Sequence, residues 1–243
     1  MRRAIAFCLV TIALVSCTAS DGSKDSATVV LFDVSDSTHA ETVRARYDET
    51  FGMVLGHLED AGGVLGADIV DDNPLAHGDL PINETFESCT VLDNSLDCGK
   101  ALDEQERKVL DASNTILANA SRGTDVFGGL ELASQFFEAY PDVGERTVLL
   151  LSDMVQFGNG IRMTALKTWS DDEIADLMSR APAVDLSGVR VYVVGAGSTA
   201  SAEMSPEQIA GIERFWSRWF ERSGAEVVFY GANLARFPIE EAA

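Results

Sequence analysis

Residues 29–38 read VVLFDVSDST, and this stretch decides the class of fold. Its first four residues are apolar, as in a strand buried on both faces, because a strand with one solvated face alternates apolar and polar residues. Small oxygen-bearing side chains follow at once, namely Asp33, Ser35, Asp36, Ser37 and Thr38. The stretch therefore predicts a buried strand whose carboxyl end is either an ordinary polar turn or a place that holds a ligand.

Three more apolar runs lie further along the chain, at residues 146–153, 189–197 and 225–231. Helical patterns separate the runs, over residues 40–61, about 101–120, 123–140 and 205–224. Strands that alternate with helices are typical of an α/β fold with right-handed crossovers. We therefore expect a doubly wound, mostly parallel sheet flanked by helices. An excursion over about residues 62–100, rich in Gly, Asp and Pro, is expected to add edge strands near 66–71 and 88–93.

The first 27 residues carry the pattern of an export signal followed by a tether. Arg2 and Arg3 precede an apolar run of twelve residues, which is shorter than the roughly 20 residues of a membrane span. The run ends in Leu14-Val15-Ser16-Cys17, which resembles the bacterial lipobox, and this resemblance implies a lipidated Cys17. We expect a lipoprotein signal peptide over 1–16, a flexible tether over 17–27 and one domain over 28–243. An ordinary secretory signal is the alternative.

The lipobox resemblance also implies a location. Acyl chains on Cys17 would hold the protein on the membrane surface of a bacterial cell envelope. The next residue is Thr18 rather than Asp, which in lipoproteins of this kind favours the outer membrane of a Gram-negative cell, facing the periplasm.

The chain is strongly acidic, with 18 basic and 39 acidic residues and a net charge of −21. Loss of Arg2 and Arg3 with the signal gives 16 − 39, or about −23. Such a charge repels nucleic acid and attracts divalent cations and basic partners. It therefore argues against a nucleic-acid partner.

Two cysteines remain once Cys8 is assigned to the signal and Cys17 to the lipid. Cys89 and Cys98 are nine positions apart, and in an exported protein they are expected to form a disulfide around a hairpin-like loop. A metal site is the weaker interpretation, because no histidine lies nearby.

Oxygen-bearing side chains follow the apolar runs at three places. Asp33, Ser35 and Ser37 follow the first run, Thr124 leads into a helix, and Asp153 follows the run that begins at residue 146. In a doubly wound sheet the loops at the carboxyl ends of neighbouring strands converge on the ligand. Hydroxyl and carboxylate oxygens suit Mg²⁺, Mn²⁺ or Ca²⁺. For any one place alone, an ordinary turn or helix cap is the better interpretation.

Together the three places resemble the metal-ion-dependent adhesion site of the von Willebrand factor A domain, which has a DxSxS loop, a distant Thr and a further Asp. The resemblance implies that Ser35 and Ser37 bind the cation directly, that Thr124 binds directly or through water, and that Asp33 and Asp153 act mainly through bound waters. It implies Mg²⁺ first, with Mn²⁺ or Ca²⁺ as alternatives. Two departures stand out: Met154 occupies a position where the family often has Gly, and the 62–100 segment is unlike a compact family core.

Two other motifs are weaker. VVGAGSTA at 193–200 imitates a dinucleotide fingerprint, but a helix does not follow it directly, so Gly195 and Gly197 are interpreted as turn residues. DVSDST lacks the second Asp of a haloacid dehalogenase nucleophile, and the three histidines offer no hydrolase triad.

The sequence therefore favours a non-enzymatic, envelope-anchored module that binds a protein partner through a divalent cation completed by a partner carboxylate. A metal-independent scaffold in an envelope or secretion assembly is the alternative, and a metal-dependent hydrolase is less favoured. The partner and the oligomeric state are not specified by the sequence.

Overall fold

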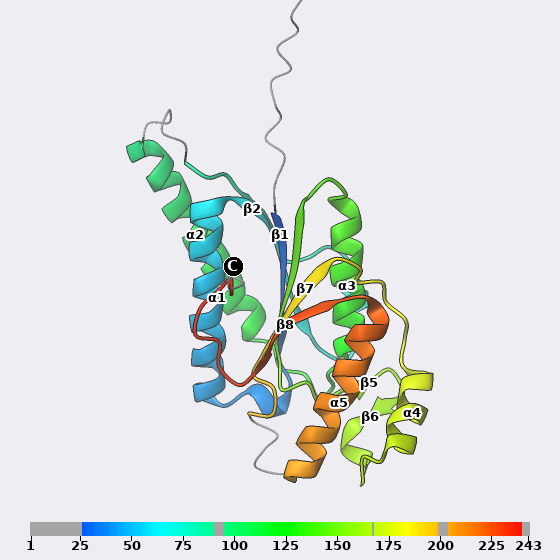
Figure 1. Ribbon diagram of the computed structural model, residues 1–243. Helices are drawn as coiled ribbons and strands as arrows, with labels where there is room; N and C mark the ends of the chain where they lie inside the picture. The colour runs from blue at the N-terminus through cyan, green and yellow to red at the C-terminus, as the bar shows by residue number, and fades with distance from the viewer. Residues whose placement is uncertain (1–25, 90–94, 167, 199–203, 240–243) are drawn as a thin grey trace, which may run out of the picture.

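A six-stranded sheet forms the centre of the protein in a computed structural model that describes residues 26–89, 95–166, 168–198 and 204–239 (Figure 1). The strand order is β3-β2-β1-β4-β7-β8. Five strands pair in parallel and β3 is antiparallel to β2. In that spatial order the strands are β3 (Ile82–Phe86), β2 (Gly63–Val70), β1 (Ser26–Asp33), β4 (Glu145–Leu151), β7 (Val189–Val194) and β8 (Glu226–Gly231). The predicted doubly wound α/β fold is confirmed.

Strand β1 shows why the continuous apolar run was informative. Side chains of a strand alternate between the two faces of a sheet. Val29 and Leu31 accordingly belong to the core on one face, while Val30 and Phe32 belong to the core on the other. All four are fully buried, because helices cover both faces. The strand begins at Ser26, so the last two residues of the predicted tether lie within it.

Two helices cover one face of the sheet and three cover the other (Figure 1). The first layer contains α1 (Glu41–Ala61) and α2 (Ser95–Leu117). The second contains α3 (Val126–Ala139), α4 (Asp171–Arg180) and α5 (Pro206–Ser223). Helix α5 begins with a capping box between Ser205 and Gln208 and ends at Gly224 in the left-handed conformation, as its sequence predicts. Its Trp216 and Trp219 are buried in the core, in agreement with a packing role.

The short elements lie in the connections between these layers. They are the 3-10 turns η1 (Asp36–Thr38), η2 (Pro74–Ala76) and η3 (Met163–Ala165), and a hairpin of β5 (Phe157–Gly158) and β6 (Ile161–Arg162). Neither the hairpin nor α4 was expected from the sequence.

The segment 62–100 differs from its prediction. Residues 63–70 form β2, which is buried along its whole length and pairs with β1, so it belongs to the central sheet rather than to an excursion. The edge strand is β3 at 82–86. Residues 88 and 89 of the predicted strand at 88–93 are not in a strand, and residues 90–93 lie outside the described residues. Helix α2 begins at Ser95 instead of near residue 101. The glycine and aspartate residues within 62–71 interrupt the apolar pattern, so the sequence did not indicate a strand buried on both faces. The burial of this strand depends on the elements that pack against it.

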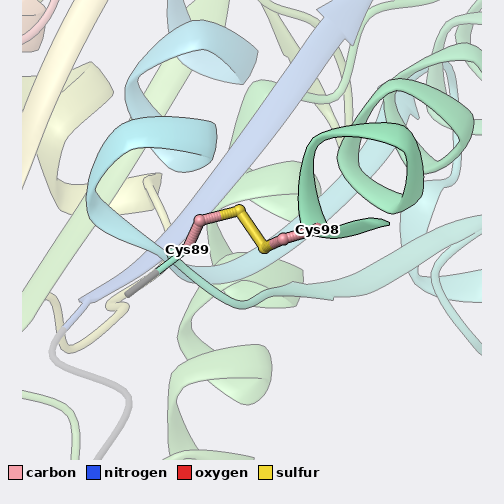
Figure 2. The surroundings of a disulfide bond; sticks show 2 residues. All are labelled: Cys89 and Cys98. Carbon is pink, nitrogen blue, oxygen red and sulfur yellow. A yellow bond between two sulfur atoms is a disulfide. The ribbon is translucent and has the colours of Figure 1, made fainter. Parts of the chain in front are cut away.

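The predicted disulfide between Cys89 and Cys98 is present (Figure 2). Cys98 lies in the first turns of α2, so the bond ties the chain after β3 to a helix rather than closing a simple hairpin. The crosslink therefore fixes the start of α2 near the antiparallel edge of the sheet.

Reduction of this disulfide is expected to lower the free energy of unfolding by about 2–3 kcal/mol, because a closed loop of roughly ten residues restricts the unfolded chain by that amount. Urea unfolding with and without reductant checks the value. A Cys89→Ser/Cys98→Ser variant serves as the control and should show no response to reductant. Equal stability of the oxidised and reduced wild type contradicts the prediction.

Within the described residues, no helix is long and apolar enough to cross a membrane. The predicted signal peptide over 1–16 and the lipid attachment at Cys17 lie outside the described residues.

Candidate functional site

The site lies where the connections of the sheet diverge. Strands β1 and β4 are neighbours, but β1 leads to α1 on one face and β4 leads by way of the β5–β6 hairpin to α4 on the other. This divergence opens a crevice at the carboxyl ends of the two strands, which is where doubly wound folds bind ligands. Asp33 is the last residue of β1, and Asp153 follows β4 by two residues. The fold therefore brings together two carboxylates that are 120 positions apart.

The carboxylate of Asp33 is buried and held by two donors. The backbone N–H of Ser35 donates to Oδ1 at 2.9 Å, and the Ser152 hydroxyl donates to Oδ2 at 2.7 Å. The second bond links the end of β1 to the end of β4. Asp33 is only 2% exposed, so its position is set by these neighbours rather than by solvent.

The other four predicted ligands line one pocket of about 200 Å³, namely Ser35, Ser37, Thr124 and Asp153. The two serine hydroxyls lie 3.0 Å apart. Asp153 is buried and its Oδ1 accepts a hydrogen bond from the N–H of Val155 at 3.0 Å. The structure therefore gathers at one crevice all five residues chosen from the sequence.

Burial, and second to it repulsion from Asp153, raise the pKa of Asp33 from its ordinary value of 3.8 to about 7. Hydrogen bonds from Ser35 and Ser152 act in the opposite direction. Two buried carboxylates side by side are costly when both are ionised. A divalent cation would relieve this repulsion.

The donor chemistry of the crevice fits a hard cation. Its side chains offer hydroxyl and carboxylate oxygens, which Mg²⁺, Mn²⁺ and Ca²⁺ prefer, and no thiolate or imidazole, and the guanidinium of Arg122 also lines the pocket. Among the described residues, no three or more His, Cys, Asp and Glu side chains gather as a metal cluster, so a site here depends on the hydroxyls as well as on two carboxylates.

Met154 occupies the position where the von Willebrand factor A domain often has glycine. Its φ is +66°, a left-handed conformation that glycine adopts freely and that costs other residues about 1 kcal/mol or more. Its N–H donates to the Ser152 hydroxyl at 2.9 Å, and its carbonyl accepts from the Trp216 indole at 2.8 Å. The Met154 side chain is fully buried. The backbone therefore has the shape that glycine favours, held by packing and hydrogen bonds.

Gln156 is a site residue that the sequence did not indicate. Its side chain is fully buried and makes three hydrogen bonds: its amide N–H groups donate to Asp125 Oδ1 at 2.9 Å and to the Gly158 carbonyl at 3.1 Å, and its Oε1 accepts from the Val126 N–H at 2.8 Å. A single glutamine in the sequence gives no signal of this role.

The β5–β6 hairpin is also joined to Thr124 directly. The Thr124 N–H donates to the Phe157 carbonyl at 3.0 Å, and the Phe157 N–H donates to the Thr124 carbonyl at 2.9 Å. Close approach is possible at Gly123, because a Cβ there would meet Asp72 Cβ at 2.6 Å. The backbone at Thr124 is thus fixed from two sides.

The structure also places the other residues that were interpreted from the sequence, namely Asp36, His39, Gly195 and Gly197. Asp36 is exposed, as expected of a solvated charge. His39 contacts the Val34 carbonyl and Arg44 at the turn before α1. Gly195 and Gly197 have φ values of +104° and +67°, in agreement with their interpretation as turn residues.

Tyr47 lies close to the two carboxylates from the side of α1. Its hydroxyl is buried and has no hydrogen-bond partner in the described part of the chain. Burial, followed by the charges of Asp33 and Asp153, raises the pKa of this phenol well above its usual value. The hydroxyl therefore stays protonated and is available as a donor.

A Tyr47→Phe variant is expected to be as stable as wild type or about 1 kcal/mol more stable, because it removes a buried hydroxyl that has no protein partner. Thermal and urea unfolding of the metal-free protein check this. A clear loss of stability would instead show that the hydroxyl is bonded, for example through buried water.

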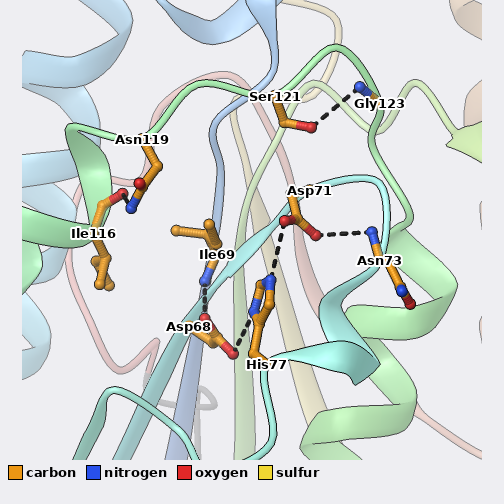
Figure 3. Close-up of polar contacts among 9 residues, drawn as sticks. All are labelled: Asp68, Ile69, Asp71, Asn73, His77, Ile116, Asn119, Ser121 and Gly123. Carbon is orange, nitrogen blue, oxygen red and sulfur yellow. Dashed lines mark hydrogen bonds and ion pairs between the residues drawn. The ribbon is translucent and has the colours of Figure 1, made fainter.

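A second polar cluster lies beside β2 and is distinct from the crevice (Figure 3). His77 Nδ1 contacts Asp68 Oδ2 at 3.0 Å and His77 Nε2 contacts Asp71 Oδ2 at 3.0 Å. Partial burial by itself lowers the pKa of His77, but the hydrogen bonds and charges of Asp68 and Asp71 outweigh it and raise the pKa overall.

This cluster makes a prediction about pH. Because the pKa of His77 is higher in the folded than in the unfolded protein, the stabilisation is fully present below about pH 6.5 and is lost as the pH rises through the folded value. A His77→Gln variant should be less stable than wild type by about 1 kcal/mol at pH 6, with a smaller difference at pH 8.5. Urea unfolding at the two pH values checks it, and a constant difference contradicts it.

The strand order and the crevice define a doubly wound α/β domain with a hydroxyl- and carboxylate-lined site at its topological switch point. No protein-family model and no curated protein matches the chain. Solved structures similar to it include the pilus adhesin SpaC from Lactobacillus rhamnosus GG, at 15% identity and a TM-score of 0.45 over 87% of this chain and 28% of that one. They also include a von Willebrand factor type A protein from Catenulispora acidiphila, at 12% identity and a TM-score of 0.39 over 83% of this chain and 43% of that one.

The chain thus spans less than half of the length of these structures. At such identities and TM-scores the similarities say nothing about activity, and the fold assignment rests on the strand order of the chain itself.

Proposed function

We propose that the protein is a divalent-metal-dependent protein-binding module, of the adhesion or scaffold kind, anchored to the bacterial cell envelope. The observation that carries the proposal is the pair of buried carboxylates, Asp33 and Asp153, beside the hydroxyl-lined pocket at the β1–β4 switch point. The resemblance of the DxSxS loop to a metal-ion-dependent adhesion site, and the resemblance of residues 14–17 to a lipobox, supply the rest of the proposal.

The proposed roles follow from the contacts of each residue. Ser35, Ser37 and Thr124 offer neutral hydroxyls to a cation, of which Mg²⁺ is the first choice and Mn²⁺ or Ca²⁺ the alternatives. Asp33 and Asp153 compensate its charge, chiefly through bound waters. Both carboxylates are oriented by donors of the protein, from Ser35, Ser152 and Val155.

A bound cation would supply an electrophilic centre that accepts a carboxylate oxygen from a partner. Neutral hydroxyls donate little charge, so such a centre keeps its attraction for an anion. The pocket opens beside these hydroxyls, which gives a partner side chain access. The proposed role is therefore recognition of an acidic side chain rather than catalysis, and we propose no enzymatic activity.

Direct measurement of Mn²⁺ binding tests the first step. Electron paramagnetic resonance titration of the whole mature chain is expected to show one Mn²⁺ site, which Mg²⁺ displaces and which Asp33→Ala removes. Asp36→Asn is the matched control, because Asp36 lines the same pocket and the change alters the net charge equally, but its carboxylate is exposed. Equal weakening by both variants, or no bound Mn²⁺, contradicts the proposal.

Partner binding tests the second step. Capture of a partner from envelope extract is expected to require Mg²⁺ or Mn²⁺ and to fail with EDTA or with Asp33→Ala. Capture that is indifferent to EDTA would favour the alternative of a metal-independent scaffold.

A further inference from the structure

A second, apolar pocket adjoins the proposed cation site. It has a volume of about 110 Å³ and lies between the start of α5 and the carboxyl ends of β7 and β8. The two pockets share Asp153, Val155 and Met204 as a common wall. A ligand that places a carboxylate in the first pocket can therefore extend along this shared wall toward the second.

The lining of this pocket is mostly hydrocarbon. Beyond the shared wall, the side chains of Ala196, Ile209 and Ile212 face it. The polar members are Glu213 and Tyr230. Burial, and then the charges of Glu213 and Asp153, raise the pKa of Tyr230 well above its usual range, so both acidic groups lie near its hydroxyl.

We propose that this pocket receives an aliphatic group that belongs to the same partner segment as the metal-binding carboxylate. The inference rests on the proposed function and narrows its partner class: the recognised element is one carboxylate flanked by an unbranched or branched aliphatic chain, not a run of acidic residues.

The size of the pocket sets the length of this group. A cavity of about 150 Å³ in another protein accommodates benzene. A pocket of about 110 Å³ therefore fits roughly three to four methylene or methyl groups, the size of a leucine or methionine side chain. Each buried methylene group should strengthen binding by about fourfold.

The charge of the pocket sets its selectivity. Glu213 and Asp153 line it, so a second carboxylate at the far end of the ligand would be repelled. The pocket should therefore accept a monocarboxylate with an apolar tail and reject a dicarboxylate of equal length.

A series of straight-chain carboxylates tests this. Water-proton relaxation of the Mn²⁺-loaded mature chain reports displacement of metal-bound water by acetate, propionate, butyrate, pentanoate and the five-carbon dicarboxylate glutarate. We expect the dissociation constant to fall about fourfold for each added methylene group up to pentanoate. Glutarate, which has the length of pentanoate, is expected to bind at least tenfold more weakly than pentanoate.

Two variants of α5 localise the effect. Ile209→Phe fills the pocket, and should leave acetate and Mn²⁺ binding within twofold of wild type while it abolishes the gain from acetate to pentanoate. Ala210→Phe is the matched control, because it adds the same ring at an exposed neighbouring position that does not line the pocket.

The outcomes separate the two proposals. Dissociation constants that do not depend on chain length, or a gain that survives in Ile209→Phe, overturn the aliphatic pocket while leaving the metal-dependent module intact. Absence of Mn²⁺ binding, or no effect of any carboxylate on relaxation, overturns the proposed function and this inference with it.

Discussion

Asp33→Asn is expected to stabilise the metal-free protein at neutral pH and to abolish its stabilisation by Mn²⁺. The folded protein buries Asp33 beside Asp153, and this raises the pKa of Asp33 to about 7. Ionisation of Asp33 above that pH therefore costs folding free energy on the order of a few kcal/mol. Asparagine keeps an oxygen for the Ser35 N–H and removes the charge, so the cost disappears together with the attraction for a cation.

The pH dependence of the wild type follows from the same shift. Between about pH 4 and pH 7 the folded protein retains a proton on Asp33 that the unfolded chain has released. The free energy of unfolding is therefore expected to fall as the pH rises through that window, and to level off above it. Added Mn²⁺ should reverse the fall, because a ligand that binds only the folded state stabilises it.

Urea unfolding of wild type, Asp33→Asn and the control Asp36→Asn at pH 5 and pH 8 measures these effects. Asp36→Asn should follow wild type, since its carboxylate is exposed. Two results would contradict this role of Asp33. One is a wild type that gains stability relative to Asp33→Asn as the pH rises, and the other is an Asp33→Asn variant that Mn²⁺ still stabilises.

Gln156→Ala is expected to lower the free energy of unfolding by about 3–5 kcal/mol. The change leaves the Val126 N–H and the Asp125 carboxylate without their buried partner, and each such loss costs about 1–3 kcal/mol. The cavity left by the side chain adds to the cost. Because Gln156 joins the β5–β6 hairpin to the start of α3, the backbone at Thr124 should also loosen, and Mn²⁺ affinity should fall.

Gln105→Ala is the matched control, because Gln105 makes one half-buried hydrogen bond, to the Thr85 carbonyl, far from the crevice. It should cost about 1 kcal/mol and leave Mn²⁺ binding unchanged. Urea unfolding measures the stability, and hydrogen exchange at the Thr124 amide, which is bonded to the Phe157 carbonyl, reports on the site. Similar behaviour of the two variants contradicts a special role for Gln156.

The sequence predicted the parts of the fold in which the residue types alone indicate burial. β1, β4 and β7 each contain a continuous run of apolar residues, so burial of those runs on both faces was evident before any neighbour was known. β2 was missed as a central strand because Gly63, Gly66 and Asp68 interrupt its pattern. Gly66 is small for a reason that only packing shows, since a Cβ there would lie 2.8 Å from Leu80 and 2.9 Å from Phe136.

For the candidate site, too, the sequence indicated some residues and only the structure showed the others. The identities of Asp33, Ser35, Ser37, Thr124 and Asp153 came from their order and from their positions after apolar strands, and the structure brings them to one crevice. Gln156 and the left-handed Met154 were beyond sequence reasoning. Their roles consist of contacts with residues distant in the chain, Asp125 for one and Trp216 for the other.

By itself, then, the amino-acid sequence determined the α/β class, the disulfide pair and the oxygen donors, because hydrophobic runs, cysteine number and side-chain chemistry are local properties. Only the tertiary structure decided that β2 is central, that two carboxylates are buried together, and that an apolar pocket shares a wall with the hydroxyl-lined pocket. Proximity and desolvation depend on which distant segments pack against each other, and these two effects give Asp33 its raised pKa.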